Sequence, residues 1–200
     1  MNVGLYGGTF SPPHKGHTRA AELFFAEASL ERLYVMPAGD PPHKKTDKWG
    51  DAKSRLEMTR LAFCGIAEVS DYEISKEGRS FTVDTLRYLK SIHPEDRLFM
   101  LVGEDMFLSL DSWREPENIM RLCTVVAMRR KDTPLSVMEK AREGYVERYG
   151  ADVMIIDDEP FEASSSLVRE MIGKGEDISA LVSAPVLEYI EKNGLYRDEN

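Results

Sequence analysis

The amino-acid sequence predicts an α/β fold that is built on a doubly wound, mostly parallel sheet with a short C-terminal helical tail. Short β-rich runs alternate with helical patterns along the chain, which is typical of strand–helix–strand units. One run, 98–102, is almost continuously apolar, as in a central parallel strand that is covered on both faces. The length of 200 residues fits one such domain with a small appendage.

The first expected strand is the β-rich run 3–6, and the pattern after it predicts a helix from about residue 17 to 29. A second strand covers 33–36 and ends at Pro37. A loop rich in proline and glycine then runs to residue 50, which indicates turns rather than a regular element.

The next helix can begin at either of two capping residues, Asp51 or Ser54. Ser54 has Glu57 at the spacing of a capping box. Gly65 is expected to end this helix, and a weak strand follows at about 69–74.

A helix that opens at Ser80 or Thr82 leads to the central strand, which ends at Gly103. Two further strands of the same buried kind are expected at 122–128 and 153–156. Between them, Ser136 and Glu139 form a second capping box, which opens a helix to about residue 149. The tail is expected to hold two short helices, with their end points as follows: 165–172 ending at Gly173, and 184–192 ending at Gly194.

These elements divide the chain into an α/β core over residues 1–160 and a C-terminal helical segment over 161–200. Ligands of such sheets bind beyond the carboxyl ends of the strands. We therefore expect functional residues in the loops after Tyr6, Met36, Val102 and Ile156.

Composition limits the partners and the compartment. The chain has 26 basic and 35 acidic residues, a net charge of −9, which argues against a dedicated nucleic-acid binder. No apolar run approaches the roughly 18 residues of a membrane helix, and no signal peptide is visible at the first residues. Cys64 and Cys123 both lie in apolar runs, so we expect two buried, reduced thiols and a cytoplasmic protein.

The strongest functional signal is the loop after the first strand, residues 7–17, which reads GGTFSPPHKGH. Its two glycines let a ligand approach the backbone closely. His14 and His17 lie three residues apart at the expected helix start, where backbone N–H groups and the helix dipole favour an anion. Together with Lys15 they predict a small phosphate cradle inside an acidic protein.

Two other interpretations of the histidines stay open from the residues alone. They could bind a metal, although no cysteine or third histidine lies nearby, so no metal site is expected. Either could instead be a packing residue. The Rossmann dinucleotide fingerprint and the Walker phosphate loop are both absent, so the loop would hold a nucleotide in another way.

The segments GGTF at 7–10 and HKGH at 14–17 resemble the signature of the nucleotidylyltransferase superfamily. Members transfer a nucleoside monophosphate from a triphosphate to a phosphate-bearing acceptor and release pyrophosphate. Further segments resemble the bacterial nicotinate-nucleotide adenylyltransferase family in order and spacing, from residue 2 to about 196. They are 37–44, 79–86, 103–105 with Trp113, 164–169, and the closing apolar and tyrosine positions.

The resemblance implies a Rossmann-like nucleotidyltransferase fold and the reaction of ATP with nicotinate mononucleotide to give nicotinate adenine dinucleotide and pyrophosphate, a step of NAD biosynthesis. It also implies Mg²⁺ bound with ATP. A phosphate monoester is largely dianionic at neutral pH, with a second pKa near 6. We therefore expect no general base and no covalent intermediate.

The family's site residues carry over position by position. The resemblance implies catalytic roles for His14, His17 and Arg169, with His17 stabilising charge on the α-phosphate. The implied ATP-binding set is Gly7, Gly8, Thr9, Phe10, His14, Gly16, His17, Gly103, Asp105, Ser165 and Arg169. The implied acceptor-binding set is Lys44 for the phosphate, Thr85 and Trp113 for the nicotinate ring, and Asp105 near the ribose.

Four positions depart from the family pattern. They are Ser11 in place of a usual Asp, Glu104 in place of a small residue, Ala163 in place of Ile, and Met128–Arg129–Arg130 in place of Arg-Pro-Gly. None of them is one of the implied catalytic residues.

Other functions remain as alternatives. A related enzyme could act on nicotinamide mononucleotide or phosphopantetheine, and a nucleotide-binding regulator could lack catalysis. A class I tRNA synthetase core is disfavoured because the chain is short and acidic. We expect ATP and nicotinate mononucleotide as partners and neither nucleic acid nor a membrane, and the sequence leaves a homo-oligomer open.

Overall fold

The computed structural model describes residues 1–39, 51–76, 78–129, 133–157 and 163–197. The chain forms two compact units, each assembled from separate stretches of sequence. Unit 1 contains Met1–Gly7, Leu23–Tyr34 and Ser80–Pro160, and unit 2 contains Gly8–Glu22, Val35–Arg79 and Phe161–Asn200. The expected division into residues 1–160 and 161–200 stays a prediction.

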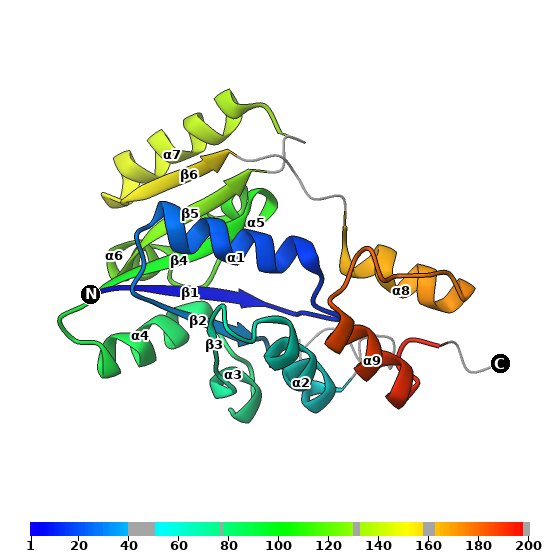
Figure 1. Cartoon of the computed structure of the whole chain (residues 1–200). Coiled ribbons are helices and arrows are strands. Elements are labelled where there is room, and N and C mark those ends of the chain that lie inside the picture. The colour runs from blue at the N-terminus through cyan, green and yellow to red at the C-terminus, as the bar shows by residue number, and fades with distance from the viewer. Residues whose placement is uncertain (40–50, 77, 130–132, 158–162, 198–200) are drawn as a thin grey trace. The chain divides into compact units, whose positions relative to one another are not determined.

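The described strands form one sheet in the order β3-β2-β1-β4-β5-β6 (Figure 1). Their bounds are β1 Asn2–Gly8, β2 Arg32–Pro37, β3 Glu68–Val69, β4 Arg97–Gly103, β5 Cys123–Arg129 and β6 Val153–Asp157. The ladders β1–β4, β4–β5 and β5–β6 are parallel, with Val3 opposite Leu98 and Leu98 opposite Cys123. The chain runs outward from β1 through β2 to β3, crosses back to place β4 on the other side of β1, and then runs outward through β5 to β6. This order confirms the predicted doubly wound sheet.

The core of unit 1 is the pair of strands β4 and β5. Met100, Val125 and Val126 are at most 2% exposed, as the continuous apolar run predicted. Helix α7 (Leu135–Tyr149) lies beside β6 (Figure 1). Tyr145 anchors α7, because its buried ring carries a hydroxyl that donates to the Phe107 carbonyl at 2.7 Å.

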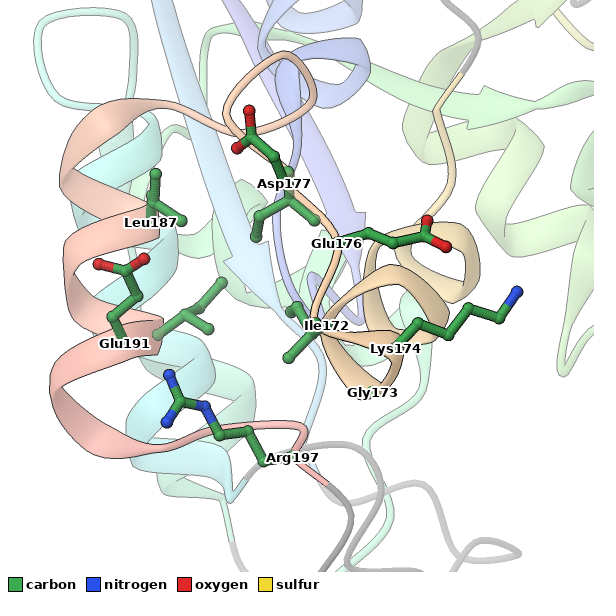
Figure 2. A pocket seen from close by; sticks show the side chains of 11 residues that line it. Ile172, Gly173, Lys174, Glu176, Asp177, Leu187, Glu191 and Arg197 are labelled. Carbon is green, nitrogen blue, oxygen red and sulfur yellow. The ribbon is translucent and has the colours of Figure 1, made fainter.

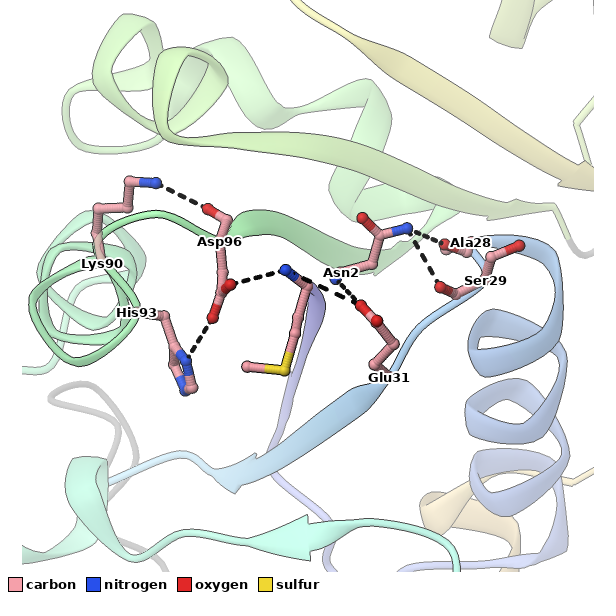
Figure 3. Close-up of polar contacts among 8 residues, drawn as sticks. Asn2, Ala28, Ser29, Glu31, Lys90, His93 and Asp96 are labelled. Carbon is pink, nitrogen blue, oxygen red and sulfur yellow. Dashed lines mark hydrogen bonds and ion pairs between the residues drawn. The ribbon is translucent and has the colours of Figure 1, made fainter.

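A polar network in unit 1 joins the start of β1 and β2 to the end of helix α4 (Thr82–Ile92), as Figure 3 shows. The Asp96 carboxylate contacts the Met1 amine at 2.7 Å and His93 Nδ1 at 3.0 Å. The hydrogen bond from the Met1 amine is the main cause that lowers the pKa of Asp96. His93 Nε2 in turn lies 3.1 Å from the Tyr34 hydroxyl, so the buried imidazole is bonded at both nitrogens.

Unit 2 contains α2 (Ala52–Ala62), α3 (Tyr72–Ser75), α8 (Ser165–Lys174) and α9 (Ala184–Asn193). Helix α1 (Lys15–Glu27) begins in unit 2 and ends in unit 1. The apolar core of unit 2 includes Phe10, Met58, Phe63, Val168 and Val186, all at most 1% exposed.

The structure selects between the two residues expected to start α2, and it corrects the expected start of α7. Asp51, not Ser54, caps α2, since its carboxylate accepts from the Ser54 backbone N–H at 2.8 Å. The predicted capping box at Ser136 is wrong: Pro134 occupies the N-cap of α7 and Ser136 lies inside the helix. Proline fits this position because its ring restricts φ to about −65°, and Pro134 has a φ of −55°.

Two expected helix ends and one strand also differ. Helix α2 ends at Ala62 with Phe63, not Gly65, as its C-cap. Gly173 does not end α8, which continues to Lys174. Gly175 ends it instead, with a φ of 72° that suits the left-handed cap. The strand expected at 69–74 is only Glu68–Val69, because the four-residue helix α3 takes up the rest.

Three short elements between β4 and β5 were not predicted. They are α5 (Glu104–Leu108), a 3₁₀ turn (Leu110–Ser112) and α6 (Pro116–Leu122). Leu122 closes α6, so β5 begins one residue later than expected. The two cysteines differ as well: Cys123 is buried, and burial raises its pKa, whereas Cys64 is exposed, contrary to the prediction.

Within the described part of the chain, no helix is both long and apolar enough to cross a membrane.

Replacing Asp51 tests the start of α2. Asp51→Ala should lower the free energy of unfolding by about 1 kcal/mol, and Asp51→Ser should lower it less because a serine oxygen still caps. The Ser54 hydrogen bond lowers the pKa of Asp51. The carboxylate therefore stabilises the fold fully above its unfolded pKa, and this contribution is lost as the pH falls through the lower folded pKa.

Denaturant unfolding at neutral pH and at a pH well below the unfolded Asp pKa of about 3.9 would measure this. The difference between wild type and Asp51→Ala should shrink in acid. A difference that is equal at both pH values would contradict the assignment of Asp51 as the cap.

Candidate functional site

The loop after β1 is organised around one buried aromatic ring. Phe10 is 1% exposed and adopts a left-handed φ of 48°. Its ring meets His17 and Phe63 edge-on, with centroids 5.1 and 5.5 Å apart. A Cβ at Gly8 would lie 2.8 Å from the Phe10 ring, so Gly8 is required for this packing. A Cβ at Gly7 would meet nothing within 4 Å.

His14 and His17 form a stacked pair whose geometry assigns a tautomer. The ring centroids are 3.7 Å apart with planes 30° from parallel. The backbone N–H of His14 donates to His17 Nδ1 at 3.1 Å, so that nitrogen must carry its lone pair. In the neutral ring the proton is then on Nε2. His17 is therefore oriented to donate from Nε2, which is the arrangement that an anionic oxygen needs.

Helix α8 holds the same loop through its first turns. Ser165 Oγ donates to the Pro12 carbonyl at 2.9 Å, and Arg169 donates to the Ser11 carbonyl at 2.5 Å. Ser11 Oγ also lies 3.3 Å from the Tyr196 hydroxyl. Burial lowers the pKa of the Arg169 guanidinium and raises the pKa of Tyr196 to about 12. Serine at position 11, a departure from the family pattern, thus contacts the tail through both backbone and side chain.

The sequence predicted that Lys15 joins His14 and His17 in a phosphate cradle, but its ammonium group bonds to another segment. Its Nζ donates to the Ser179 carbonyl at 3.0 Å, and its backbone N–H donates to the Leu181 carbonyl at 2.8 Å. The ammonium group therefore joins α1 to the segment between α8 and α9. Gly16 follows as the second residue of α1 and is partly exposed.

Arg55 is a residue that the sequence analysis missed. It is 2% exposed, and one guanidinium nitrogen donates to the Thr9 carbonyl at 3.1 Å and the Ala38 carbonyl at 2.7 Å. The Ala38 N–H donates to the Gly8 carbonyl at 2.8 Å, which brings the two loops together. The spacing of Arg55 with Met58 places it on the buried face of α2, a signal that could have identified it.

Four further predicted site residues, Gly103, Asp105, Thr85 and Trp113, lie in unit 1. Gly103 is the N-cap of α5, and Asp105 is exposed on that helix. Glu104 between them is 2% exposed and accepts from Thr133 Oγ1 at 3.1 Å. This contact gives the departure at Glu104 a structural role.

Thr85 and Trp113 belong to the wall around the start of α4. Thr85 is fully buried and its hydroxyl lies 3.5 Å from the Phe81 carbonyl. Trp113 is partly exposed after the 3₁₀ turn and lines a pocket of about 240 Å³. Lys44 lies outside the described residues. The structure thus brings His14, His17, Ser165 and Arg169 together in unit 2, and their roles stay predictions.

A larger pocket of about 490 Å³ lies in unit 2 between the end of α8 and α9 (Figure 2). Ile172 and Leu187 contribute apolar surface, whereas Lys174, Glu191 and Arg197 place charges at the same hollow. Mixed charge of this kind shows no preference for one ligand class. The described residues also contain no group of three or more His, Cys, Asp or Glu side chains that could hold a metal ion.

The sheet order and the loop with its paired histidines define a nucleotidyltransferase-like protein, and the comparisons agree. Residues 5–171 match the family model of cytidylyltransferase-like proteins. A probable nicotinate-nucleotide adenylyltransferase of Desulfitobacterium hafniense is 35% identical over 198 residues, which are 98% of this chain and 95% of the relative. One of Shouchella clausii is 34% identical over 200 residues, covering 99% and 98%.

The chain therefore belongs to the nicotinate-nucleotide adenylyltransferase family of cytidylyltransferase-like proteins. A solved Plasmodium falciparum nicotinic acid mononucleotide adenylyltransferase, complexed with NaAD, has the same fold. Its TM-score is 0.80 at 20% identity, with 98% of this chain and 97% of that chain covered.

The two adjacent glycines at the end of β1 should respond differently to alanine. Gly8→Ala should lower the free energy of unfolding by about 1–3 kcal/mol, because the new methyl group overlaps the buried Phe10 ring. Gly7→Ala should leave it unchanged or raise it slightly, since the space is open and alanine restricts the unfolded chain. Thermal and denaturant unfolding of both variants would measure this. Equal destabilisation would contradict the packing described for Phe10.

Proposed function

We propose that the protein transfers the adenylyl group of ATP to nicotinate mononucleotide, giving nicotinate adenine dinucleotide and pyrophosphate. Family membership supports this reaction class. The observation that carries the proposal is the geometry of His17, whose Nδ1 is bonded to the backbone so that Nε2 carries the donor proton. Arg169 and Ser165 reach the same loop from α8 and add a cation and a hydroxyl.

The reaction requires little proton transfer. The attacking group is a phosphate oxygen of the mononucleotide, which is largely dianionic near neutral pH because its second pKa is about 6. This oxygen forms a bond to the α-phosphorus of ATP, the bond from the α-phosphorus to its leaving oxygen breaks, and pyrophosphate departs with the electron pair. The protein must therefore position anions and stabilise charge, and no carboxylate base is needed.

His17 stabilises the charge that develops on the α-phosphate by donating from Nε2. His14 orients His17 through its backbone N–H and through ring stacking. Arg169 and Ser165 bind the triphosphate from segment 161–200, which would complete the ATP site. Their hydrogen bonds to the Ser11 and Pro12 carbonyls support this assignment. Gly7, Gly8, Thr9, Phe10 and Gly16 shape the loop that faces the phosphates.

The acceptor is assigned to residues of unit 1 and to Lys44. Trp113 and Thr85 hold the pyridine ring, Gly103 and Asp105 line the ribose region, and Lys44 meets the acceptor phosphate. The names of the relatives support nicotinate as the ring.

A divalent metal, Mg²⁺, enters as part of the ATP substrate. The described residues provide no cage of their own, and Mg²⁺ commonly keeps its waters and binds substrate phosphates with few protein ligands. The acidic net charge supports a small-molecule enzyme without nucleic-acid or membrane partners, and the assigned reaction supports a cytoplasmic location. We leave the oligomeric state open.

Three substitutions of His17 distinguish the role of its Nε2–H donor from the role of its side-chain size. His17→Ala should lower kcat by about 10²–10³, which is the usual effect of removing one transition-state donor. His17→Gln can place an amide N–H near the position of Nε2 and should recover part of the rate. His17→Asn reaches only the position of Nδ1 and should not. The measurement is pyrophosphate release, with circular dichroism to confirm folding. Near-wild-type turnover of a folded His17→Ala would overturn the role of His17.

The acceptor is tested with the purified wild-type protein, ATP and Mg²⁺. Nicotinate mononucleotide should support pyrophosphate release at a much higher kcat/KM than nicotinamide mononucleotide or phosphopantetheine. If only phosphopantetheine reacts, the assignment of nicotinate mononucleotide as the acceptor is wrong. If no acceptor reacts while ATP still binds, a non-catalytic nucleotide-binding regulator is the better assignment.

A further inference from the structure

Helix α5 follows β4 and carries Asp105, which the proposed function assigns to the ribose region. The helix has 5 residues, Glu104–Leu108. A helix of this length is not stable by itself, because its first turn costs more conformational entropy than its few hydrogen bonds return. Contacts with other elements must therefore determine where α5 lies and how it is rotated about its axis.

Both ends of α5 are bonded to α7 or to the residue just before its N-cap. Near the end of α5, the buried Phe107 carbonyl accepts from the Tyr145 hydroxyl at 2.7 Å. At the start of α5, the Glu104 carboxylate accepts from Thr133 Oγ1 at 3.1 Å, and Thr133 directly precedes the N-cap residue of α7. Residues three apart lie on one face of a helix, so these two bonds hold one face of α5 toward α7.

Thr133 is itself held by the neighbouring strands. Arg129 donates from Nε to the Thr133 carbonyl at 3.0 Å and from NH1 to the Asp157 carboxylate at 2.8 Å. Arg129 and Asp157 are partners in the parallel ladder of β5 and β6, and the Arg129 side chain is only 14% exposed. The hydrogen bond to Glu104 therefore comes from a residue whose position is set by the sheet.

Glu104 and Asp105 leave the first turn of α5 in different directions. Glu104 is 2% exposed, whereas Asp105 is exposed. Successive residues point about 100° apart around a helix, so holding Glu104 inward also determines the direction of Asp105. Both residues follow β4 at the carboxyl edge of the sheet, where ligands of doubly wound sheets bind.

We propose that Glu104 is a positioning residue, which through its bond to Thr133 fixes the orientation of Asp105 for binding a substrate ribose. The inference rests on the proposed function, because that function assigns Asp105 to the ribose region. A misdirected Asp105 weakens substrate binding and leaves the chemistry at the phosphates unchanged. The effect of Glu104 is therefore on KM and not on kcat.

The test measures pyrophosphate release by the full-length protein, with ATP and nicotinate mononucleotide each varied while the other is saturating. Asp105→Asn identifies the substrate whose KM depends on Asp105. Glu104→Ala should raise the same KM by about three- to tenfold, the usual effect of losing one hydrogen bond, and leave kcat almost unchanged. Glu104→Gln should stay near wild type, because its amide oxygen can still accept from Thr133.

A double-mutant cycle separates positioning from a general loss of packing. In the Asp105→Asn background, Glu104→Ala should no longer raise that KM, because no carboxylate is left to orient. Thr133→Val removes the same hydrogen bond without altering α5 and should reproduce the effect of Glu104→Ala. Circular dichroism checks that each variant is folded, and Thr133→Val carries the comparison if Glu104→Ala is not.

Glu143→Ala is the matched control. Glu143 is an exposed glutamate of α7 in the same unit, and it makes no hydrogen bond to α5, all of whose residues the structure describes. The change in charge and side chain is identical to that of Glu104→Ala. This variant should keep both KM values of wild type, which separates a local contact from a general effect of charge.

The outcomes distinguish this inference from the proposed function. If wild type releases no pyrophosphate with nicotinate mononucleotide, the proposed function and this inference fail together. If wild type is active but Glu104→Ala and Thr133→Val keep both KM values, the positioning role alone is overturned and the proposed function stands. The same holds if Glu104→Ala raises KM equally in the Asp105→Asn background, or if Asp105→Asn changes neither KM.

Discussion

The buried guanidinium of Arg55 is the interaction on which the geometry of unit 2 depends. Burying a charge costs free energy, and hydrogen bonds to the charged group offset that cost. Here the carbonyls of Thr9 and Ala38 accept from it, so the loops after β1 and β2 are fixed to one helix. The Phe10 ring packs within the same unit against Phe63, just beyond the end of α2. The position of the paired histidines follows from this arrangement.

Cations close to the loop bond to backbone carbonyls of the loop and of the segments beside it. Arg55, Arg169 and Lys15 all donate to backbone carbonyls. Carbonyl oxygens carry partial negative charge and repel phosphate. Hydrogen bonds from cations to these oxygens reduce that repulsion. This use of charge explains how a protein with a net charge of −9 can hold a polyanionic nucleotide. The composition can be acidic overall because a few cations close to the loop determine the electrostatic potential there.

Features set by a few neighbouring residues were predictable from sequence. The apolar run in β4 and the glycine- and histidine-rich loop identified the sheet and the candidate site, and the fold class and family are confirmed. Gly173 and Gly175 show where local patterns stop. Either glycine could end α8, and only the backbone geometry selects Gly175. The short helices α5 and α6 have 5 and 7 residues, which is too few for a helical period of apolar residues to be recognised. The helical spacing of Arg55 with Met58 could have indicated its burial, but its partners are carbonyls of two distant loops, which no local pattern encodes.

The hydrogen bonds between the first loop and the tail also impose an order in time. Ser165 bonds to Pro12 across 153 positions of sequence, and Tyr196 contacts Ser11 across 185. A ribosome releases the loop well before the segment from Ser165 to Tyr196, so these contacts form only after that segment has been made. Contacts of such long sequence separation are slow to close. The growing chain therefore carries its histidine loop without the restraints from α8 and Tyr196, and a nascent protein interrupted before α8 would lack Arg169 altogether. The loop therefore acquires its full set of hydrogen bonds only after the tail has been synthesised.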